Sequence, residues 1–210
     1  MTVNEGGRRR QVVLATRNAK KLVELRRILA GVEALADIDV LGLSDVALFD
    51  EPAETELTFA GNALLKARAT VAATGVPSLA DDSGLCVDAL NGMPGVLSAR
   101  WAGHARSDEA NNQLLLDQLG DVPDEHRGGR FVAAVALCLP SGFEQVTSGE
   151  MAGGVIRTPV GTNGFGYDPL FVPDGADGLT SAQLSAERKD LLSHRGSALR
   201  AMVPTLLDVL

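Results

Sequence analysis

The stretch VPSLADDSG, residues 76–84, places two adjacent carboxylates, a hydroxyl and a glycine directly after an apolar run. The apolar part is typical of a short buried strand, and Asp-Ser-Gly is typical of a turn. We therefore expect Asp81 and Asp82 at the end of a strand, where a metal ion and a water molecule can reach them. An ordinary solvated turn is the alternative interpretation of this segment alone.

Strands and helices alternate along the rest of the chain. Apolar runs predict strands over 11–16, 38–43 and 131–139, the last with a hairpin partner over 145–150. Helical spacing of apolar residues predicts helices over 19–29, 58–74 and 107–119, and from 193 to the end of the chain. The strongest of these, 58–74, has an apolar stripe made of Phe59, Ala63, Ala67 and Val71. Asn62 and Lys66, four residues apart, share a different face of that helix.

Residues 90–103 and 161–169 are rich in turn-forming residues and are expected to be irregular. Pro204 is expected to bend or shorten the last helix. The chain contains no internal repeat and no linker, so residues 11–210 are predicted to form a single domain. Residues 1–10 are polar, with three arginines, and are predicted to form a flexible arm.

Composition excludes several classes of protein. The net charge of −8 argues against a general nucleic-acid binder, which needs a basic face. No apolar run is long enough to span a membrane or to form a signal peptide, so we expect no membrane partner. Cys86 and Cys138 are too few for a disulfide framework and lack metal-ligand spacing, so we expect buried, inert thiols in a reducing cytoplasm.

The four lysines fall inside three polar segments, although the chain has fifteen arginines. Lysine supplies a compact point charge that suits a phosphate. In the first segment, Thr16, Arg17, Asn18, Ala19, Lys20 and Lys21 follow a predicted strand and open a helix. A helix N-terminus of this kind favours a phosphate, although the segment is not a Walker A loop. A helix cap followed by exposed lysines, and lysines clustered by chance, are the alternatives.

Acidic residues supply candidate ligands for a hard cation such as Mg²⁺, which binds through one or two carboxylates together with substrate phosphates. The candidates are Glu51, Glu54, Glu56, Asp81 and Asp82. A carboxylate beside the metal can also deprotonate a water molecule for attack on phosphorus. For most of residues 51–56 a solvated acidic loop is the simpler interpretation. Asp81 and Asp82, if both lie at a strand end, repel each other without a cation.

Two further segments suit a flat, polar ligand. Phe165, Gly166, Tyr167 and Asp168 place two aromatic rings beside glycines, so that a nucleobase can stack on a ring. A core aromatic beside a turn is the alternative. His194 and Arg195 lie at a predicted helix start and offer two donors for a keto oxygen. There the alternative is a capped helix with an exposed imidazole.

Together these blocks resemble the inosine triphosphate pyrophosphatase family, whose members hydrolyse deaminated purine nucleoside triphosphates. The similar stretches are LATRNAKK, ETELTFAGNALLKA, LADDSGLCVDAL with GMPGVLSARWAG, PVGTNGFGYDPLFVP and AQLSAERKDLLSHRGSAL, in order from residue 14 to residue 199. The resemblance implies an elongated α/β fold with a mixed central β-sheet flanked by helices and an active-site cleft between two lobes. It also implies a homodimer and Mg²⁺-dependent cleavage of ITP, dITP and XTP to the monophosphate and pyrophosphate.

The resemblance also assigns roles to individual residues. Asp82 would be the base that activates water, and it would hold Mg²⁺ together with Glu54. The triphosphate would be held by Thr16, Arg17, Asn18, Ala19, Lys20, Lys21 and Lys66, with Ser83 beside it. The purine pocket would be formed by Phe165, Gly166, Tyr167, Asp168, Lys189, His194 and Arg195.

The chain departs from the family pattern at Gly61, Gln183 and Arg188, where the family often has an acidic residue. The last two are expected to make the rim of the purine pocket less acidic. Two other functions remain open. One is a hydrolase that acts on ordinary triphosphates or releases orthophosphate, and the other is a catalytically silent nucleotide-binding protein. The Asp81-Asp82 pair argues against the second, because an anion binder gains nothing from carboxylates near its ligand.

Overall fold

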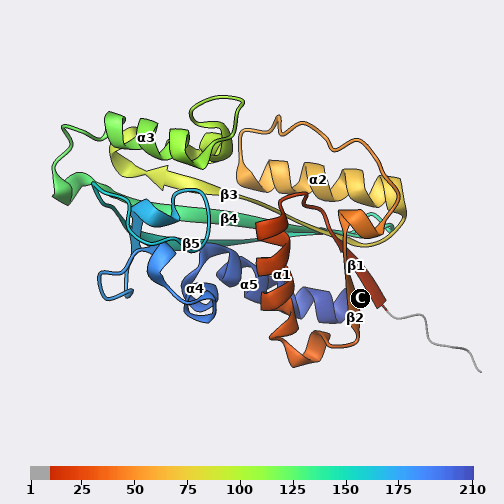
Figure 1. The fold of residues 1–210 in the computed structure, drawn as a ribbon. Helices are drawn as coiled ribbons and strands as arrows, with labels where there is room; N and C mark the ends of the chain where they lie inside the picture. Colours follow the sequence, from red (N-terminus) through yellow and green to blue (C-terminus); the bar gives the residue numbers. More distant parts are fainter. Residues whose placement is uncertain (1–9) are drawn as a thin grey trace, which may run out of the picture.

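The computed structural model describes residues 10–210 (Figure 1). Residues 1–9, and with them nearly all of the predicted N-terminal arm, lie outside the described part. Arg10 begins the first strand, one residue earlier than the sequence predicts. The fold is α/β, as expected, with helices on both faces of a mixed six-stranded sheet.

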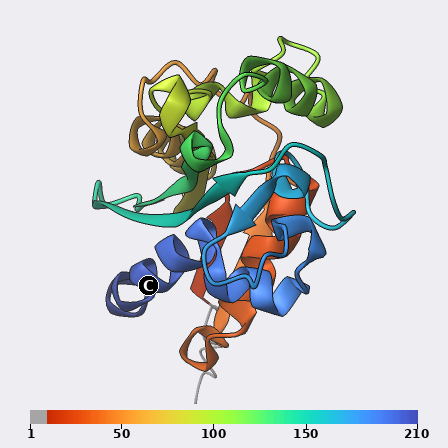
Figure 2. The same ribbon diagram turned by 90° about the vertical axis from the view of Figure 1, so that its left-hand side faces the viewer.

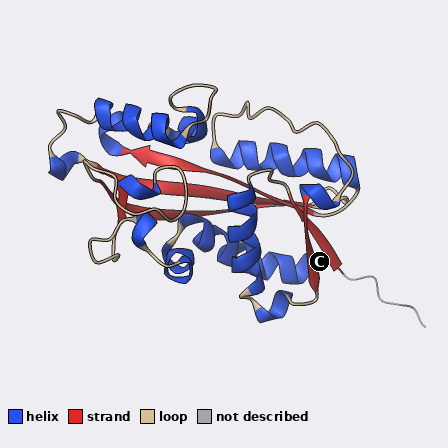
Figure 3. Cartoon of the chain, in the orientation of Figure 1, coloured by secondary structure: helices blue, strands red, loops and turns tan. Residues whose placement is uncertain are grey.

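The sheet has the strand order β2-β1-β3-β4-β5-β6. Its strands are β1 (Arg10–Leu14), β2 (Ile38–Gly42), β3 (Ser78–Val87), β4 (Gly128–Cys138), β5 (Glu144–Val155) and β6 (Phe171–Pro173). β1 runs parallel to both of its neighbours, whereas β3 to β6 pair antiparallel. The long strands β3, β4 and β5 give the sheet its elongated shape (Figure 3).

Two layers of helices cover the sheet. The α-helices are α1 (Ala19–Ala30), α2 (Phe59–Thr74), α3 (Asp108–Gln118), α4 (Ala186–Leu192) and α5 (His194–Val209). Short 3₁₀ helices are η1 (Glu33–Leu35), η2 (Leu43–Asp45), η3 (Asp88–Leu90), η4 (Gly95–Arg100), η5 (Asp124–His126), η6 (Asp168–Leu170) and η7 (Ser181–Gln183). α2 and α3 lie over one face of the sheet, and α1, α4 and α5 lie over the other (Figure 2).

Helix α2 packs on the sheet through small side chains. Ala63 and Ala67 are fully buried against alanines of β3 and β4, so the predicted apolar stripe faces the core. Small side chains at such an interface let a helix come close to the strands beneath it. On the opposite face, α1 and α5 bury larger residues, and α5 continues through Pro204 rather than ending there.

The structure corrects the prediction that the acidic pair lies in a turn after a strand. Asp81 and Asp82 lie in the middle of β3 and pair with Val135 and Ala134 of β4. The turn preference of Asp-Ser-Gly is overridden because the long strand β4 supplies ladder partners along the whole segment. β3 continues through Gly84, where a larger residue would not fit because a Cβ would lie 2.4 Å from the carbonyl oxygen of Gly95.

Other segments also differ from the sequence prediction. The irregular region expected over 90–103 contains the six-residue 3₁₀ helix η4. The short elements α4 and β6 were not predicted, because seven and three residues are too few to show a clear period. Both cysteines are buried and free, as expected.

The length of β1 leaves one edge of β3 open. β1 pairs with β3 only at Ser78 and Leu79, and the chain then turns away into α1. Beyond these residues the same side of β3 has no strand partner within residues 10–210, apart from a single bridge between Cys86 and Pro94. In open α/β sheets, ligands bind in the crevice at the carboxyl end of a strand where successive connections leave on opposite faces. Here α1, in the connection from β1 to β2, and α2, in the connection from β2 to β3, lie on opposite faces of the sheet, so this position is beside β1.

Candidate active site

A cavity of ≈ 290 Å³ lies at this crevice, at the carboxyl end of β1 and along the open edge of β3. Most of the residues singled out from the sequence line it, namely Thr16, Arg17, Asn18, Lys21, Glu54, Lys66, Asp82, Ser83, Phe165, Gly166, Tyr167, Asp168, Lys189, His194 and Arg195. Ala19 and Lys20 do not line it but border an adjacent groove, where Lys20 Nζ lies 3.5 Å from the carbonyl oxygen of Gly164. Segments far apart in the sequence therefore meet at one place.

The turn between β1 and α1 is fixed by its own polar side chains. Asn18 caps α1, and its Oδ1 accepts hydrogen bonds from the backbone N–H of Lys20 and Lys21 at 3.0 and 3.2 Å. Thr16 Oγ1 accepts from the Asn18 N–H at 3.2 Å. Because these amide groups are already bonded, a ligand would meet the side chains of this turn rather than a free helix N-terminus.

Asp81 holds two cations on the α1 and α5 side of the sheet. Its Oδ2 accepts from Lys21 Nζ at 2.9 Å and from Arg195 Nε at 3.1 Å. Arg195 also donates to Glu24 of α1 at 2.6 Å and to Ser83 Oγ at 2.9 Å. Burial alone would raise the pKa of the Asp81 carboxyl, but Lys21 and Arg195 hold it well below its usual range. Asp81 is therefore ionised and orients the cations rather than facing the ligand.

Asp82 lies on the opposite face, under α2. Its Oδ2 accepts from Asn62 Nδ2 at 3.1 Å, and its Oδ1 lies 3.3 Å from Lys66 Nζ. Asn62 and Lys66 thus reach the same carboxylate, as their shared helix face allows. Burial raises the pKa of Asp82, although the charge of Lys66 opposes the rise. A carboxylate with a raised pKa is a better proton acceptor than an ordinary one.

Glu54 meets Asp82 across the Lys66 ammonium. Lys66 Nζ lies 3.0 Å from Glu54 Oε1, and Arg100 donates to Glu54 Oε2 at 3.3 Å. Burial alone would raise the pKa of Glu54, but the charge and hydrogen bond of Lys66, together with the charges of Lys21 and Arg106, outweigh burial and lower it. Glu54 is therefore an anion beside Asp82.

The donor set fits a hard cation that completes its coordination with a ligand. Residues 10–210 contain no cluster of three or more His, Cys, Asp or Glu side chains that could hold a metal by itself. Glu54 and Asp82 nevertheless converge on one positive charge, the Lys66 ammonium. Mg²⁺ is commonly bound by one or two carboxylates together with substrate phosphates, so this pair suits it.

The sequence left two interpretations of the aromatic residues at 165–168, a ring that stacks on a nucleobase and a core aromatic beside a turn. The structure shows one residue of each kind. Phe165 is half-buried and lines the cavity, and its ring lies 5.3 Å from Lys189 Nζ and 5.7 Å from Arg195 Cζ. Tyr167 belongs to an apolar core cluster, and its hydroxyl donates to the Ser98 carbonyl oxygen at 2.9 Å. Phe165 therefore offers a ring for stacking, whereas Tyr167 is mainly a core aromatic.

The loop that carries Phe165 is tied down on both sides. Asp168 Oδ2 accepts from the Phe165 N–H at 2.8 Å and from Lys189 Nζ at 2.7 Å. Asp108 of α3 accepts from the Gly166 N–H at 2.8 Å, and Asn112 donates to the Gly166 carbonyl oxygen at 3.0 Å. These bonds fix the position of the ring, so Asp168 acts through the loop.

His194 is buried, which makes the alternative of an exposed imidazole wrong. Its ring stacks on Phe131 with centroids 5.0 Å apart, and Nδ1 has no hydrogen-bond partner in the part of the chain that the structure describes. Burial lowers the pKa of His194 well below its usual value, and the charges of Arg195 and Lys189 add to this shift. The imidazole is therefore neutral at pH 7, and His194 lines the cavity.

Several residues that shape the cavity were not assigned a role from the sequence, namely Glu24, Asn62, Arg100, Arg106 and Asp108. Asp81 was a candidate cation ligand in the sequence, and the structure pairs it with Lys21 and Arg195. Asn62 could have been found from the sequence, because it shares a helix face with Lys66. Glu24 lies three residues after Lys21 on α1, a spacing that places both on one side of a helix. The others come from loop or helix ends whose partners are distant in sequence.

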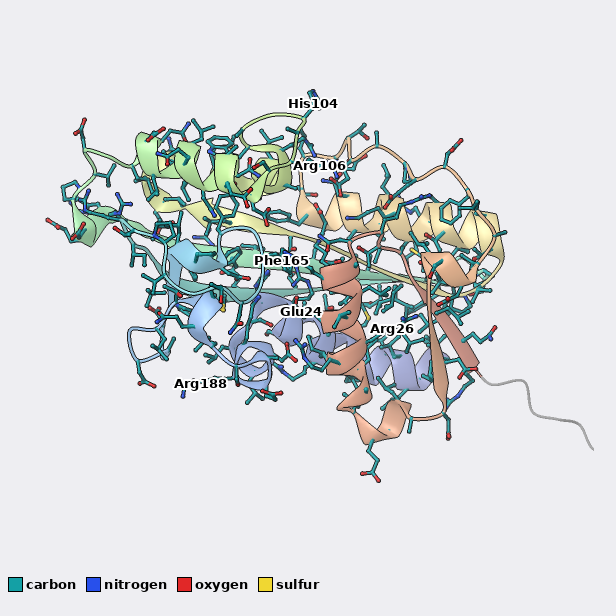
Figure 4. The ribbon with its side chains drawn as sticks, viewed as in Figure 1. Glu24, Arg26, His104, Arg106, Phe165 and Arg188 are labelled. Carbon is teal, nitrogen blue, oxygen red and sulfur yellow. The ribbon has the colours of Figure 1, made fainter. Side chains whose placement is uncertain are left out.

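The departures at Gly61, Gln183 and Arg188 lie outside the lining of the cavity. Gln183 Oε1 accepts from the Thr180 N–H at 3.0 Å, and Arg188 pairs with Asp177 at 2.6 Å. Figure 4 shows Arg188 at the outer side of the α4 region, away from Phe165. These substitutions therefore leave the charge of the cavity itself unchanged. No helix within residues 10–210 has the length and hydropathy that a membrane crossing requires.

Fold and site together define an α/β protein with a cation-lined, carboxylate-containing cavity at the carboxyl end of a parallel strand, the kind of site that takes a phosphorylated ligand. The chain belongs to the Ham1 family, whose family model matches residues 12–205.

The relatives support this assignment along nearly the whole chain. A protein of Nocardia farcinica named dITP/XTP pyrophosphatase is 61% identical over 198 residues, covering 93% of this chain and 94% of the relative. A dITP/XTP pyrophosphatase of Streptomyces coelicolor is 52% identical over 95% of this chain and 98% of its own. The crystal structure of a nucleoside-triphosphatase, dITP/XTP pyrophosphatase, from Mycobacterium abscessus has a TM-score of 0.74 at 52% identity, covering 92% of this chain and 99% of that one. The structure of the Ham1 protein of Staphylococcus aureus has a TM-score of 0.82 at 38% identity, covering 94% of this chain and 98% of that one.

Proposed function

We propose that this protein hydrolyses deaminated purine nucleoside triphosphates, ITP, dITP and XTP, to the nucleoside monophosphate and pyrophosphate. Curated relatives at 52–61% identity are named dITP/XTP pyrophosphatases, which supports the reaction and the substrate class. The structural observation that carries the proposal is that one cavity contains Asp82 and Glu54, the cations Lys21 and Lys66, and the ring of Phe165. This combination suits the three parts of a metal-bound nucleotide, namely the triphosphate, the divalent cation and the purine.

Asp82 is proposed as the base and, with Glu54, as a ligand of Mg²⁺. The raised pKa of Asp82 suits proton transfer from a water molecule, and Asn62 fixes the orientation of the carboxylate. Water adds to the α-phosphorus, its proton passes to Asp82, and the bond from that phosphorus to the pyrophosphate oxygen breaks. Mg²⁺, when bound, would neutralise phosphate charge.

The phosphate chain is proposed to lie along Thr16 to Lys21 and Lys66, beside Ser83. Lys21 and Lys66 are buried or half-buried and already oriented by Asp81, Asp82 and Glu54, so little side-chain freedom remains to be lost on binding. Of the residues proposed for this role, Ala19 and Lys20 have the weakest support, because both face the adjacent groove.

The purine base of the substrate is proposed to stack on Phe165, with its 6-oxo group next to His194 and Arg195. Arg195 donates to Asp81, Glu24 and Ser83, which leaves N–H groups of its five for a ligand. Adenine presents an amine at that position, so the donors would stay unpaired and ATP would be disfavoured.

The remaining proposals rest on the resemblance and on composition: a cytoplasmic homodimer built from one two-lobed domain over 11–210, which removes deaminated nucleotides before they enter DNA or RNA. The net charge of −8 supports the absence of a nucleic-acid partner.

The test is hydrolysis of ITP, dITP, XTP, GTP and ATP with and without Mg²⁺, measuring pyrophosphate and orthophosphate separately. Release of pyrophosphate from ITP, dITP and XTP that needs the metal and is much slower with GTP and ATP is the expected result. Orthophosphate as the product, or equal rates with ATP, would favour a triphosphatase of different scope. No turnover with any of the five would favour a binding protein.

A further inference from the structure

We propose that Arg106 is a further substrate-binding residue of this site, and that its guanidinium holds the pyrophosphate part of the triphosphate. The inference rests on the proposed function and adds a contact from the loop between η4 and α3. Arg106 lines the same cavity as Lys21 and Lys66 but comes from the α3 side.

Among the cations that line the cavity, Arg106 is the one whose side chain has no hydrogen-bond or ion-pair partner within residues 10–210. Each of the others faces a carboxylate: Arg17 with Glu51, Lys21 with Asp81, Lys66 with Glu54 and Asp82, Lys189 with Asp168, and Arg195 with Asp81 and Glu24. The Arg106 guanidinium makes no hydrogen bond and no ion pair with any residue of the described chain, 10–210. An arginine carries five donors and no acceptor, so these donors are free for an anion.

The backbone at Arg106 is in a conformation that its side chain does not favour. Arg106 has φ 50°, in the left-handed region. The other non-glycine residues of the described chain with positive φ are Asn91 and Asp177, types that often adopt this region. An arginine gains nothing locally from such a conformation. Strain of this kind is typically kept where a side chain must point in a required direction.

The position of Arg106 suits contact with the phosphates of the substrate better than contact with its purine. Arg106 lines the cavity together with Glu54, the proposed metal ligand, and with Lys66. The cations around the Phe165 ring are instead Lys20, Lys189 and Arg195. In Figure 4, Arg106 lies in the helix layer that contains α2 and α3, whereas Phe165 lies lower in the view, level with the strands and beside α1.

The loop is anchored so that the guanidinium can act from a defined place. Asn111 of α3 accepts from the Ala102 N–H at 2.7 Å and donates to the Ala99 carbonyl oxygen at 3.3 Å. Ser107 caps α3 directly after Arg106. The residue itself is exposed, so a ligand reaches it without a rearrangement of the core.

The test compares binding of inorganic pyrophosphate and of inosine monophosphate by calorimetry, in the presence of Mg²⁺. The variants are Arg106→Gln, Arg106→Lys and Arg106→Gly, and the control is Arg130→Gln, which removes an exposed arginine outside the cavity lining. Arg106→Gly is included because glycine accepts the positive φ, so its Tm should stay within a few degrees of the unsubstituted protein. It therefore separates loss of the charge from loss of the fold.

We expect Arg106→Gln and Arg106→Gly to weaken pyrophosphate binding about tenfold or more, as for one charge-assisted hydrogen bond, with monophosphate affinity unchanged. Arg106→Lys should retain part of the affinity. If the pyrophosphate affinity of the variants were unchanged, or if the monophosphate affinity fell equally, the inference about Arg106 would be wrong. The proposed function would still stand in that case, provided that the unsubstituted protein hydrolyses ITP. If the unsubstituted protein neither bound pyrophosphate nor hydrolysed ITP, both would fail.

Discussion

Asp81 and Asp82 are neighbours in β3, yet their carboxylates lie on opposite faces of the sheet and have different partners. Asp81 binds Lys21 and Arg195, whereas Asp82 binds Asn62 and Lys66. Successive residues of a strand alternate between faces, so the pair does not share one cation. Both sides nevertheless border one cavity, because the edge of β3 is open beside the short strand β1.

Asp82→Asn removes the proposed base while keeping a side chain of the same shape. We expect kcat for ITP to fall by about 10²–10⁴-fold, the usual contribution of a general base, with nucleotide binding weakened but measurable. Pyrophosphate release measures kcat, and calorimetry measures binding. Asp88→Asn, at an exposed carboxylate, is the control. Near-normal kcat in Asp82→Asn would show that another group takes the proton.

Asp81→Asn should act mainly on stability. Lys21 would lose its carboxylate partner in a buried place, and Arg195 would keep Glu24 and the Ser83 hydroxyl but lose the second of its two carboxylates. Breaking a buried ion pair at one partner costs about 3–5 kcal/mol of unfolding free energy. Urea unfolding of Asp81→Asn against Asp88→Asn measures it. A loss as small as that of the exposed control would mean that water already screens these charges.

His194 should make stability depend on pH. Its pKa in the folded protein is lowered well below the ordinary 6.5, so below pH 6.5 the unfolded chain binds a proton that the folded protein does not. Unfolding free energy therefore falls as the pH drops from 7 toward 5, by at most about 1.4 kcal/mol per pH unit from this group.

The variant His194→Gln removes this titration and should flatten the profile over that range, as measured by urea unfolding at several pH values. His104→Gln is the matched control, because Figure 4 shows His104 at the outer end of an exposed loop. A profile of equal slope in His194→Gln and in the unsubstituted protein would place the responsible group elsewhere.

Phe165→Leu and Tyr167→Phe should separate stacking from packing. Loss of the Phe165 ring should raise KM for ITP about tenfold, since stacking of a base on an aromatic ring is worth about 1–3 kcal/mol. Tyr167→Phe removes the hydrogen bond to Ser98 and should lower unfolding free energy by about 1 kcal/mol with KM nearly unchanged. If Tyr167→Phe instead raised KM as much as Phe165→Leu, the tyrosine hydroxyl would have a direct role with substrate.

Much of this architecture follows from local patterns. The helices at 58–74 and 107–119 have clear periods and caps and lie nearly where predicted. β4 and β5 pair as predicted, but β5 continues to Val155, five residues beyond the predicted end of that strand. The placement of Asp81 and Asp82 was wrong because strand pairing is a property of two distant segments. Local turn preference cannot show that β4 continues far enough to pair with both.

The candidate site was predictable to a similar extent. The polar segments of the sequence contain most of the residues that line the cavity, but they do not show which of these residues pair with one another. The pairing of Asp81 with Lys21 and Arg195 depends on the alternation of faces along β3, which is visible only once the register is known. The free guanidinium of Arg106 and the buried hydroxyl of Tyr167 likewise depend on tertiary contacts that leave no local signal.

The two alanines of α2 that face the sheet have a consequence for how this protein can change over time. Ala63 and Ala67 set how closely the helix approaches the sheet, and Lys66, on the same helix, must reach Asp82 across that gap. A larger side chain at either alanine could fill the core well and still move the ammonium away from the carboxylate. Selection on catalysis would therefore conserve small residues at core positions that never touch substrate.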